Sequence, residues 1–155
     1  MSTIGFVGLG AMGAPMARNL LARGFKVRGF DVRASALEAL EQAGGTRAGS
    51  AADTASGADM LLLMVVNAAQ AEAVLFEGGA LGRLPEGALV TLMATCPPGA
   101  VQAIAERVEM AGRRFVDAPV SGGVAGAEKA ALTICSISWS FTRPCPVRRR
   151  MINGP

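Results

Sequence analysis

Apolar residues near the start of the chain change from a short run to helical spacing. Residues 3–8 form a mostly apolar run that ends in glycine, and Met12, Met16 and Leu20 then follow at intervals of four before Gly24. The run predicts a buried strand, and the spacing predicts the apolar face of a helix that a glycine ends. We therefore predict a strand over 3–8 and a helix from about Met12 to Gly24.

The same alternation continues to about residue 117. Ser35 and Glu38 have the spacing of a capping box, in which each side chain bonds a backbone N–H at the start of a helix. Pro97 and Pro98 are placed to start another helix. The predicted strands are 26–31, 46–48, 60–66, 88–93 and 114–117, and the predicted helices are 35–44, a short one from Ser50, 70–76 and 97–111.

Strands that alternate with helices in this way predict a doubly wound α/β sheet with parallel strands. Residues 60–66 are wholly apolar, which is typical of a strand covered by helices on both faces. A chain of 155 residues is long enough for one such domain with a hydrophobic core.

The composition changes abruptly after Ile134. Residues 135–155 contain no Ala, one Gly and three Pro, together with the only Trp and two of the three Cys, and show no helical or strand period. We predict a domain over 1–134 and an atypical basic tail over 135–155. The tail is either disordered or translated in a shifted frame.

The net charge of +3 belongs to that tail. Four arginines and no acid lie in 135–155, so residues 1–134 sum to −1, and we expect neither the domain nor the run Arg148–Arg150 to bind nucleic acid. The longest run of large apolar residues, 60–66, is too short to span a bilayer, and no cleavable leader is apparent. With an odd number of widely spaced cysteines, these features predict a cytoplasmic protein that does not bind membranes.

Two residue types are absent from the sequence. It contains no His and no Tyr, and its only lysines are Lys26 and Lys129. This composition excludes His-based acid–base catalysis, His-containing metal sites and a Tyr–Lys proton relay. We predict no metal site.

A glycine motif lies between the first predicted strand and the first predicted helix. It has the form G-x-G-x-x-G, the fingerprint of a Rossmann-type dinucleotide site when it stands in this context. Gly8 permits a tight turn, Gly10 lets a pyrophosphate approach the backbone, and Gly13 lets helix and strand pack closely. The alternative is a strand-to-helix turn without a ligand. The predicted cofactor-binding residues here are Gly8, Leu9, Gly10, Ala11, Met12 and Gly13.

Asp31 ends the second predicted strand, 18 residues after Gly13. A carboxylate there accepts hydrogen bonds from the adenosine ribose and repels a 2′-phosphate, which favours NAD over NADP. Arg33 is an alternative partner for that phosphate, and Asp31 is alternatively only a residue of the turn before a helix. We predict NAD as the cofactor.

Two further stretches resemble one family. Residues 4–16 (IGFVGLGAMGAPM) are similar to the N-terminal signature of the 3-hydroxyacid dehydrogenases, which include 3-hydroxyisobutyrate dehydrogenase and 6-phosphogluconate dehydrogenase. Residues 117–123 (DAPVSGG) are similar to the substrate-recognition motif of that family. Within the family, residues 30–33, 65–70 and 73–76 look most like L-threonate dehydrogenases. The resemblance covers about residues 1–134.

The resemblance implies roles for six more residues. Ser121, Gly122 and Gly123 would bind the carboxylate of a small hydroxy acid. Thr95 would lie near the nicotinamide ribose, and Val66 and Asn67 would line the cofactor site. Alternatively, Thr95 only caps the helix at Pro97 and Asn67 only ends a strand.

The sequence also departs from the family. The catalytic lysine of the family lies on a helix well after the Ser-Gly-Gly motif, whereas Lys129 is only eight residues past Ser121 and stands where the family has a small residue. The next position, usually Gly, is Ala130. We therefore expect no catalytic residue in this chain, and Lys129 is interpreted as a surface charge.

The family's all-helical second domain is also absent from these 155 residues. We accordingly expect a truncated NAD-dependent oxidoreductase, inactive alone, whose full-length form acts on a hydroxy acid such as L-threonate or 3-hydroxyisobutyrate and is a homo-oligomer. The alternatives are a non-catalytic dinucleotide-binding module and nucleic-acid binding through the tail.

Overall fold

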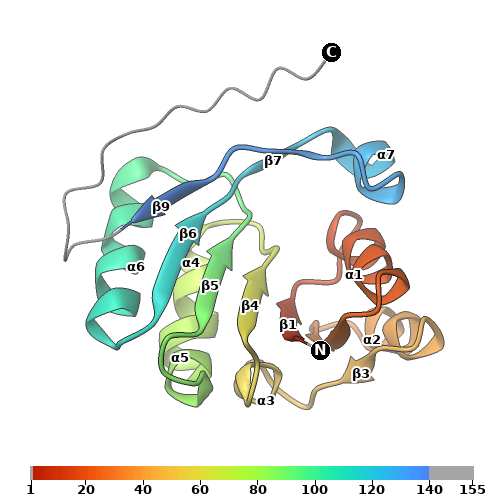
Figure 1. Ribbon diagram of the computed structural model, residues 1–155, viewed down its shortest axis with the longest axis horizontal. Coiled ribbons are helices and arrows are strands. Elements are labelled where there is room, and N and C mark those ends of the chain that lie inside the picture. Colours follow the sequence, from red (N-terminus) through yellow and green to blue (C-terminus); the bar gives the residue numbers. More distant parts are fainter. Residues whose placement is uncertain (1, 140–155) are drawn as a thin grey trace.

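The chain forms a central, mostly parallel sheet with helices on both faces. The computed structural model describes residues 2–139, and Figure 1 shows their arrangement. Seven strands lie in the order β3-β2-β1-β4-β5-β6-β9. The first six strands in this order are parallel to one another. Their bounds are β1 Thr3–Val7, β2 Lys26–Phe30, β3 Thr46–Arg47, β4 Met60–Leu63, β5 Leu89–Leu92, β6 Arg114–Asp117 and β9 Ile137–Trp139. The prediction of a doubly wound Rossmann-type fold is confirmed.

Alternating side chains of the strands fill two separate cores. In β1, Phe6 belongs to one core and Val7 to the other, because successive side chains point to opposite faces of a sheet. Helices α1 and α2 cover the core that contains Phe6, and α3, α5 and α6 cover the core that contains Val7. The helices are α1 Gly13–Ala22, α2 Ala34–Gln42, α3 Ala51–Ala55, α4 Ala68–Glu72, the π-helix η1 Ala73–Glu77, α5 Ala80–Arg83, α6 Pro98–Met110 and α7 Gly123–Glu128.

The predicted capping box at Ser35 is wrong. Helix α2 begins at Ala34, its N-cap residue is Arg33, and no side chain caps it. The reason is the Asp31 carboxylate, which accepts a hydrogen bond from the Arg33 backbone N–H at 2.9 Å and so holds the turn before Ser35 is reached. The short helix predicted from Ser50 is present as α3, and the Ser50 side chain caps it by accepting a hydrogen bond from the Asp53 N–H.

Residues 118–134 leave the sheet and return to it. They contain a short antiparallel pair, β7 Val120–Ser121 with β8 Thr133–Ile134, and helix α7 between the two strands. This segment, called the arm below, crosses the carboxyl ends of the sheet strands and lies over α1 (Figure 1). None of its elements was predicted.

The chain then enters β9, where no strand was predicted. Strand β9 pairs antiparallel with β6, so the sequence change after Ile134 does not prevent residues 137–139 from joining the sheet. The proposed domain boundary at residue 134 remains a prediction. Residues 140–155, with most of the predicted tail, lie outside the described residues.

Candidate functional site

The turn after β1 contains three glycines, and the packing of the chain itself requires glycine at two of them. Gly8 has a φ of +93°, and a Cβ there would collide with the Met64 carbonyl oxygen at the end of β4. A Cβ at Gly13 would collide with the Gly8 carbonyl oxygen, because α1 begins directly against the turn. A larger residue at Gly8 would force the turn away from the end of β4, and one at Gly13 would force α1 away from the turn.

Gly10 is different. A Cβ placed there would have a single heavy atom within 4 Å, Nη2 of Arg33 at 3.8 Å, and the φ of Gly10 is not positive. The fold therefore does not itself require glycine at this position. Open space beside Gly10 leaves the backbone accessible to a ligand.

Unpaired donors lie next to this space. Residues 2–139 provide no acceptor for the backbone N–H groups of Ala11, Met12 and Gly13, which form the start of α1. Such N–H groups and the helix dipole favour a negatively charged group at the N-terminus of a helix. Leu9, in contrast, is buried, its N–H donates to Asp31 Oδ2, and its carbonyl oxygen accepts from Arg33 Nη2.

Asp31 follows β2 at the same end of the sheet. Its side chain is only 8% exposed, and its Oδ2 accepts a hydrogen bond from the Leu9 N–H at 2.7 Å. Burial alone would raise the pKa of Asp31, but hydrogen bonds from the Arg33 side chain and backbone and from Leu9, with the Arg33 charge, hold it below its ordinary value. Asp31 is therefore a carboxylate at neutral pH.

Three more predicted site residues follow the neighbouring strands. Val66, after β4, is 78% exposed, and its N–H donates to Gln70 Oε1 at 3.0 Å. Asn67 Oδ1 caps α4 by accepting from the Gln70 N–H, so its side chain has a structural partner in this structure. Thr95, after β5, is exposed and does not cap α6, whose N-cap is Pro97 without a side-chain hydrogen bond.

The arm carries Ser121, Gly122 and Gly123, all of them exposed. Gly122 and Gly123 have φ values of +125° and +61°, which favour glycine, and they join β7 to α7. The arm is anchored to α1, since Asn19 Nδ2 donates to the Ala127 carbonyl oxygen at 2.6 Å. Asn19 was missed by sequence reasoning because nothing local to α1 indicates a partner 108 residues away.

Asp117, at the start of the DAPVSGG motif, has an unusual environment. Among the described residues, its Oδ1 is the buried side-chain oxygen or nitrogen that has no hydrogen-bond partner. Burial raises the pKa of Asp117, and burial together with the Asp117 charge raises the pKa of the Cys96 thiol. Cys96 is therefore kept as a thiol, the less nucleophilic form.

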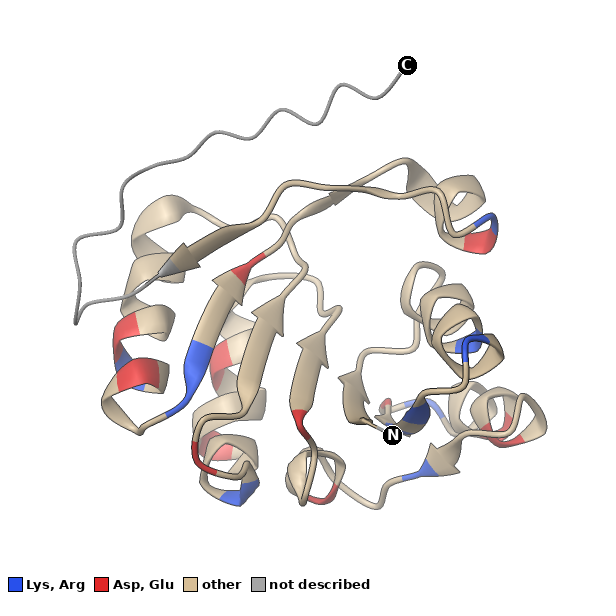
Figure 2. Cartoon of the chain, in the orientation of Figure 1, with Lys and Arg blue, Asp and Glu red and all other residues tan. Residues whose placement is uncertain are grey.

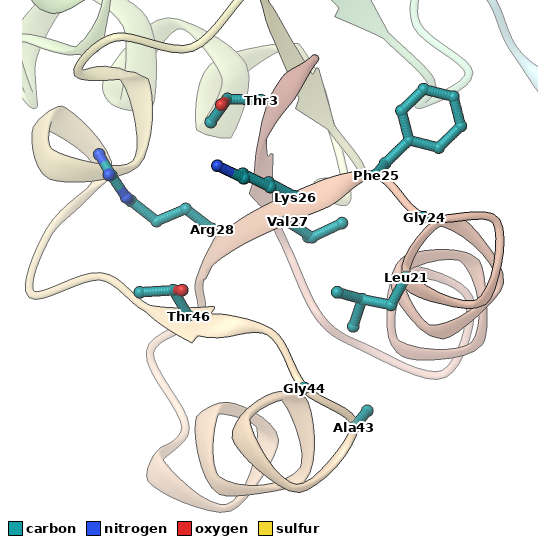
Figure 3. A pocket seen from close by; sticks show the side chains of 10 residues that line it. All are labelled: Thr3, Leu21, Gly24, Phe25, Lys26, Val27, Arg28, Ala43, Gly44 and Thr46. Carbon is teal, nitrogen blue, oxygen red and sulfur yellow. The ribbon is translucent and has the colours of Figure 1, made fainter. Parts of the chain in front are cut away.

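A separate hollow lies away from this edge of the sheet. It has a volume of about 680 Å³ and is bordered by Phe25, Lys26 and Arg28 around the amino end of β2 (Figure 3). Ligands of doubly wound sheets bind at the carboxyl ends of the strands, and Arg28 is already bonded to the carbonyl oxygens of Asp53 and Ser56. This hollow is not the dinucleotide site.

Charges over the described part of the chain are mixed. Lys and Arg positions are interspersed with Asp and Glu positions over helices and strands (Figure 2). Within residues 2–139, no helix is long and apolar enough to cross a membrane, and no group of three or more potential His, Cys, Asp or Glu ligands is clustered for a metal ion.

The strand order and the glycine turn define a class. Strands β2 and β3 lie on one side of β1 and β4 to β6 lie on the other, so the strand order switches between β1 and β4, which is the point where dinucleotides bind. The glycine turn, the start of α1 and Asp31 all lie at the carboxyl ends of these strands. The class is a dinucleotide-binding domain of the Rossmann type. The chain belongs to the family of the NAD binding domain of 6-phosphogluconate dehydrogenase, whose model matches residues 3–136.

Individual relatives agree with the resemblance in the sequence. L-threonate dehydrogenase of Cupriavidus necator is 44% identical over 132 residues, covering 84% of this chain and 44% of the relative. Human mitochondrial 3-hydroxyisobutyrate dehydrogenase is 38% identical over 131 residues, covering 84% of this chain and 39% of the relative. The predicted resemblance to the 3-hydroxyacid dehydrogenases is thereby confirmed, and the matching family model is that of an NAD-binding domain.

A solved structure is similar over the same region. The 3-hydroxyisobutyrate dehydrogenase of Mycobacterium tuberculosis, determined with L-serine, has a TM-score of 0.84 at 32% identity and covers 88% of this chain and 46% of that one. The chain thus spans less than half the length of these relatives.

Proposed function

We propose that this chain is the cofactor-binding part of an NAD-dependent oxidoreductase that oxidises a small hydroxy acid, such as L-threonate or 3-hydroxyisobutyrate. The observation that carries the proposal is the open backbone at Gly10 beside the unpaired N–H groups of α1. Asp31 adds a carboxylate at the position that would accept the ribose hydroxyls. The relatives named L-threonate and 3-hydroxyisobutyrate dehydrogenase support the substrate class.

Different residues would bind the pyrophosphate, the adenosine ribose and the substrate carboxylate. The N–H groups of Ala11, Met12 and Gly13 would hold the pyrophosphate, Asp31 would orient the adenosine ribose, and the hydroxyl and N–H groups of Ser121–Gly123 would hold the substrate carboxylate. Val66, Asn67 and Thr95 would line the site between them. When bound, NAD supplies the hydride acceptor, and the protein contributes binding, orientation and electrostatics.

A general base is the part that this chain does not supply. Oxidation of an alcohol needs a group to take the hydroxyl proton as the hydride leaves, and the sequence has no His or Tyr. Lys26 lies at the amino end of β2, and Lys129 is an exposed residue at the end of α7. We accordingly propose that the 155-residue chain binds NAD without turning over a substrate.

Paired glycine variants test the cofactor site. In Gly10→Ala the methyl group has room in the fold, so thermal stability should stay unchanged while NADH affinity, measured by fluorescence titration, falls about tenfold or more. Gly13→Ala should lose stability as well, because the new Cβ meets the Gly8 carbonyl oxygen. Gly82→Ala, where a Cβ meets nothing within 4 Å, is the control variant, and its NADH affinity should stay unchanged. Unchanged NADH binding in Gly10→Ala would remove the basis for the proposal.

The second candidate is a dinucleotide-binding module without any substrate, which the shortage of catalytic side chains favours. The two candidates differ at Ser121–Gly123. Only an enzyme fragment has a reason to bind a hydroxy-acid carboxylate there. Chemical-shift changes at those three residues on adding L-threonate to the NADH complex would favour the enzyme, and their absence would favour the module.

A further inference from the structure

Arg33 donates hydrogen bonds to the Asp31 carboxylate, on which the proposed ribose contact depends. Its backbone N–H and Nε donate to Asp31 Oδ1 at 2.9 and 3.0 Å, and its Nη2 donates to Asp31 Oδ2 at 3.3 Å. Oδ2 also accepts from the Leu9 N–H. An ionised carboxylate offers about four lone-pair sites, and the four hydrogen bonds occupy them. No acceptor site on Asp31 is left for a ribose hydroxyl in this arrangement.

Two of these four bonds can be released without disturbing the fold. Both come from the Arg33 guanidinium, whose side chain is 56% exposed and whose other contact is the Leu9 carbonyl oxygen at 3.1 Å. The other two come from the backbone N–H groups of Leu9 and Arg33, which would stay in place. Movement of one exposed side chain would therefore open Asp31 while the carboxylate stays ionised and oriented.

The guanidinium also borders the space beside Gly10. Nη2 of Arg33 is the heavy atom that lies within 4 Å of the position of a Gly10 Cβ. A dinucleotide that approaches the Gly10 backbone must therefore meet Arg33. After displacement, the planar guanidinium would stand beside the ribose, and its N–H groups suit bidentate contact with a phosphate.

We propose that Arg33 is a specificity-determining residue that competes with the adenosine ribose for Asp31. Once displaced, its guanidinium becomes the partner of a 2′-phosphate. The inference rests on the proposed function and deepens it. It implies that the chain binds NADH less tightly than Asp31 alone would permit, and that it accepts NADPH more readily than a lone carboxylate would.

The test is a pair of titrations on the whole chain and on Arg33→Met, which keeps a long apolar side chain but loses the charge. Release of an ion pair whose guanidinium is 56% exposed should tighten NADH binding about two- to fivefold. Loss of the phosphate partner should weaken NADPH binding about tenfold or more. In Arg33→Met, the dissociation constant of NADPH divided by that of NADH should therefore rise by more than either effect alone would raise it. Arg83→Met, an exposed arginine on α5, controls for the change in net charge.

A measurement without cofactor checks the same contact. Carboxyl NMR of the cofactor-free chain should show the pKa of Asp31 below its ordinary range, and a higher pKa in Arg33→Met, because the guanidinium bonds are lost while burial remains. An unchanged pKa would show that the two side chains do not interact in solution and would overturn the proposal.

The outcomes separate this inference from the proposed function. If the chain binds NADH but Arg33→Met binds it equally or less tightly, Arg33 is no competitor and only this inference fails. If NADPH affinity is the same in the chain and in Arg33→Met, the phosphate role fails. If neither protein binds a dinucleotide, both proposals fail, whereas binding restored by Arg33→Met would support both.

Discussion

Ala130 has the backbone conformation of a glycine. It is the non-glycine residue with positive φ in the described chain, at +53°, and it follows Lys129, the C-cap of α7. The Ala130 N–H donates to the Ala127 carbonyl oxygen, and the Ala131 N–H donates to that of Gly126 at 2.9 Å. These two bonds are those of a Schellman motif, whose left-handed position is usually Gly. A Cβ at this position costs conformational energy.

Ala130→Gly should therefore stabilise the protein. Relief of the left-handed strain outweighs the greater entropy of glycine in the unfolded chain, so the free energy of unfolding should rise by about 0.5–1 kcal/mol. Urea denaturation measures it as a higher midpoint. Ala125→Gly, inside α7, is the matched control and should destabilise by about the same amount. A loss of stability in both variants would contradict the strain at Ala130.

At the scale of elements, one side-chain hydrogen bond joins the arm to the body of the domain within residues 2–139. The Asn19 amide reaches the Ala127 carbonyl oxygen from α1, and Val120 adds apolar contact to the core under that helix. Both contacts join the proposed substrate motif to the helix that begins the proposed cofactor site. We therefore expect loss of this bond to loosen the arm relative to α1.

Asn19→Ala should loosen the arm selectively. Loss of one neutral, partly buried hydrogen bond costs about 1 kcal/mol. Because the sheet is not involved, this loss should lower the free energy of local opening of the arm and leave that of the sheet unchanged. Amide hydrogen exchange should become faster over 123–131 and stay unchanged in β1 and β4. Gln102→Ala, which removes a surface amide on α6, should change neither region. Equal acceleration in the sheet would contradict a local role.

The regular elements could be predicted from the sequence, and the arm could not. Residues 60–63 belong to an unbroken apolar run, and residues 98–110 are long enough to show a helical period. The strands of the arm have only two residues each, and α7 is built from Gly, Ala, Val and Glu, so neither has a period to detect. Strand β9 was missed because its pairing is provided by β6 and not by its own pattern.

The site was predictable in kind but not in its contacts. A glycine motif between strand and helix indicates a dinucleotide turn, and the structure adds that Gly8 and Gly13 are needed for packing while Gly10 is not. The hydrogen bonds that Arg33 makes to Asp31 depend on side-chain conformation, which a residue pattern does not determine. The Ser35 cap failed for the same reason, since a neighbouring carboxylate decided where α2 begins.

At the scale of the whole molecule, we expect the chain to bind the cofactor without turning over a hydroxy acid. The proposal that this chain supplies no general base, a group worth about 10²–10⁴-fold in rate, predicts that the 155-residue chain binds NADH. It also predicts that NAD with L-threonate or 3-hydroxyisobutyrate gives no increase in NADH absorbance. A fusion that replaces residues 135–155 with the helical half of a relative should restore the reaction. Turnover by the unmodified chain that Lys129→Ala abolishes would instead make Lys129 the base.

The central position of β1 affects the order in which the sheet is completed during synthesis. β1 is made first, yet it lies between β2 and β4, and the bond from the Thr3 N–H to Asp59 joins residues 56 positions apart. After β2 ends at Phe30, another 33 residues must be made before β4 ends at Leu63. At about 5–20 residues per second, this takes roughly 2–7 s. During that interval the nascent chain has one edge of its central strand without a partner, so this edge is open to chaperones or to misassembly.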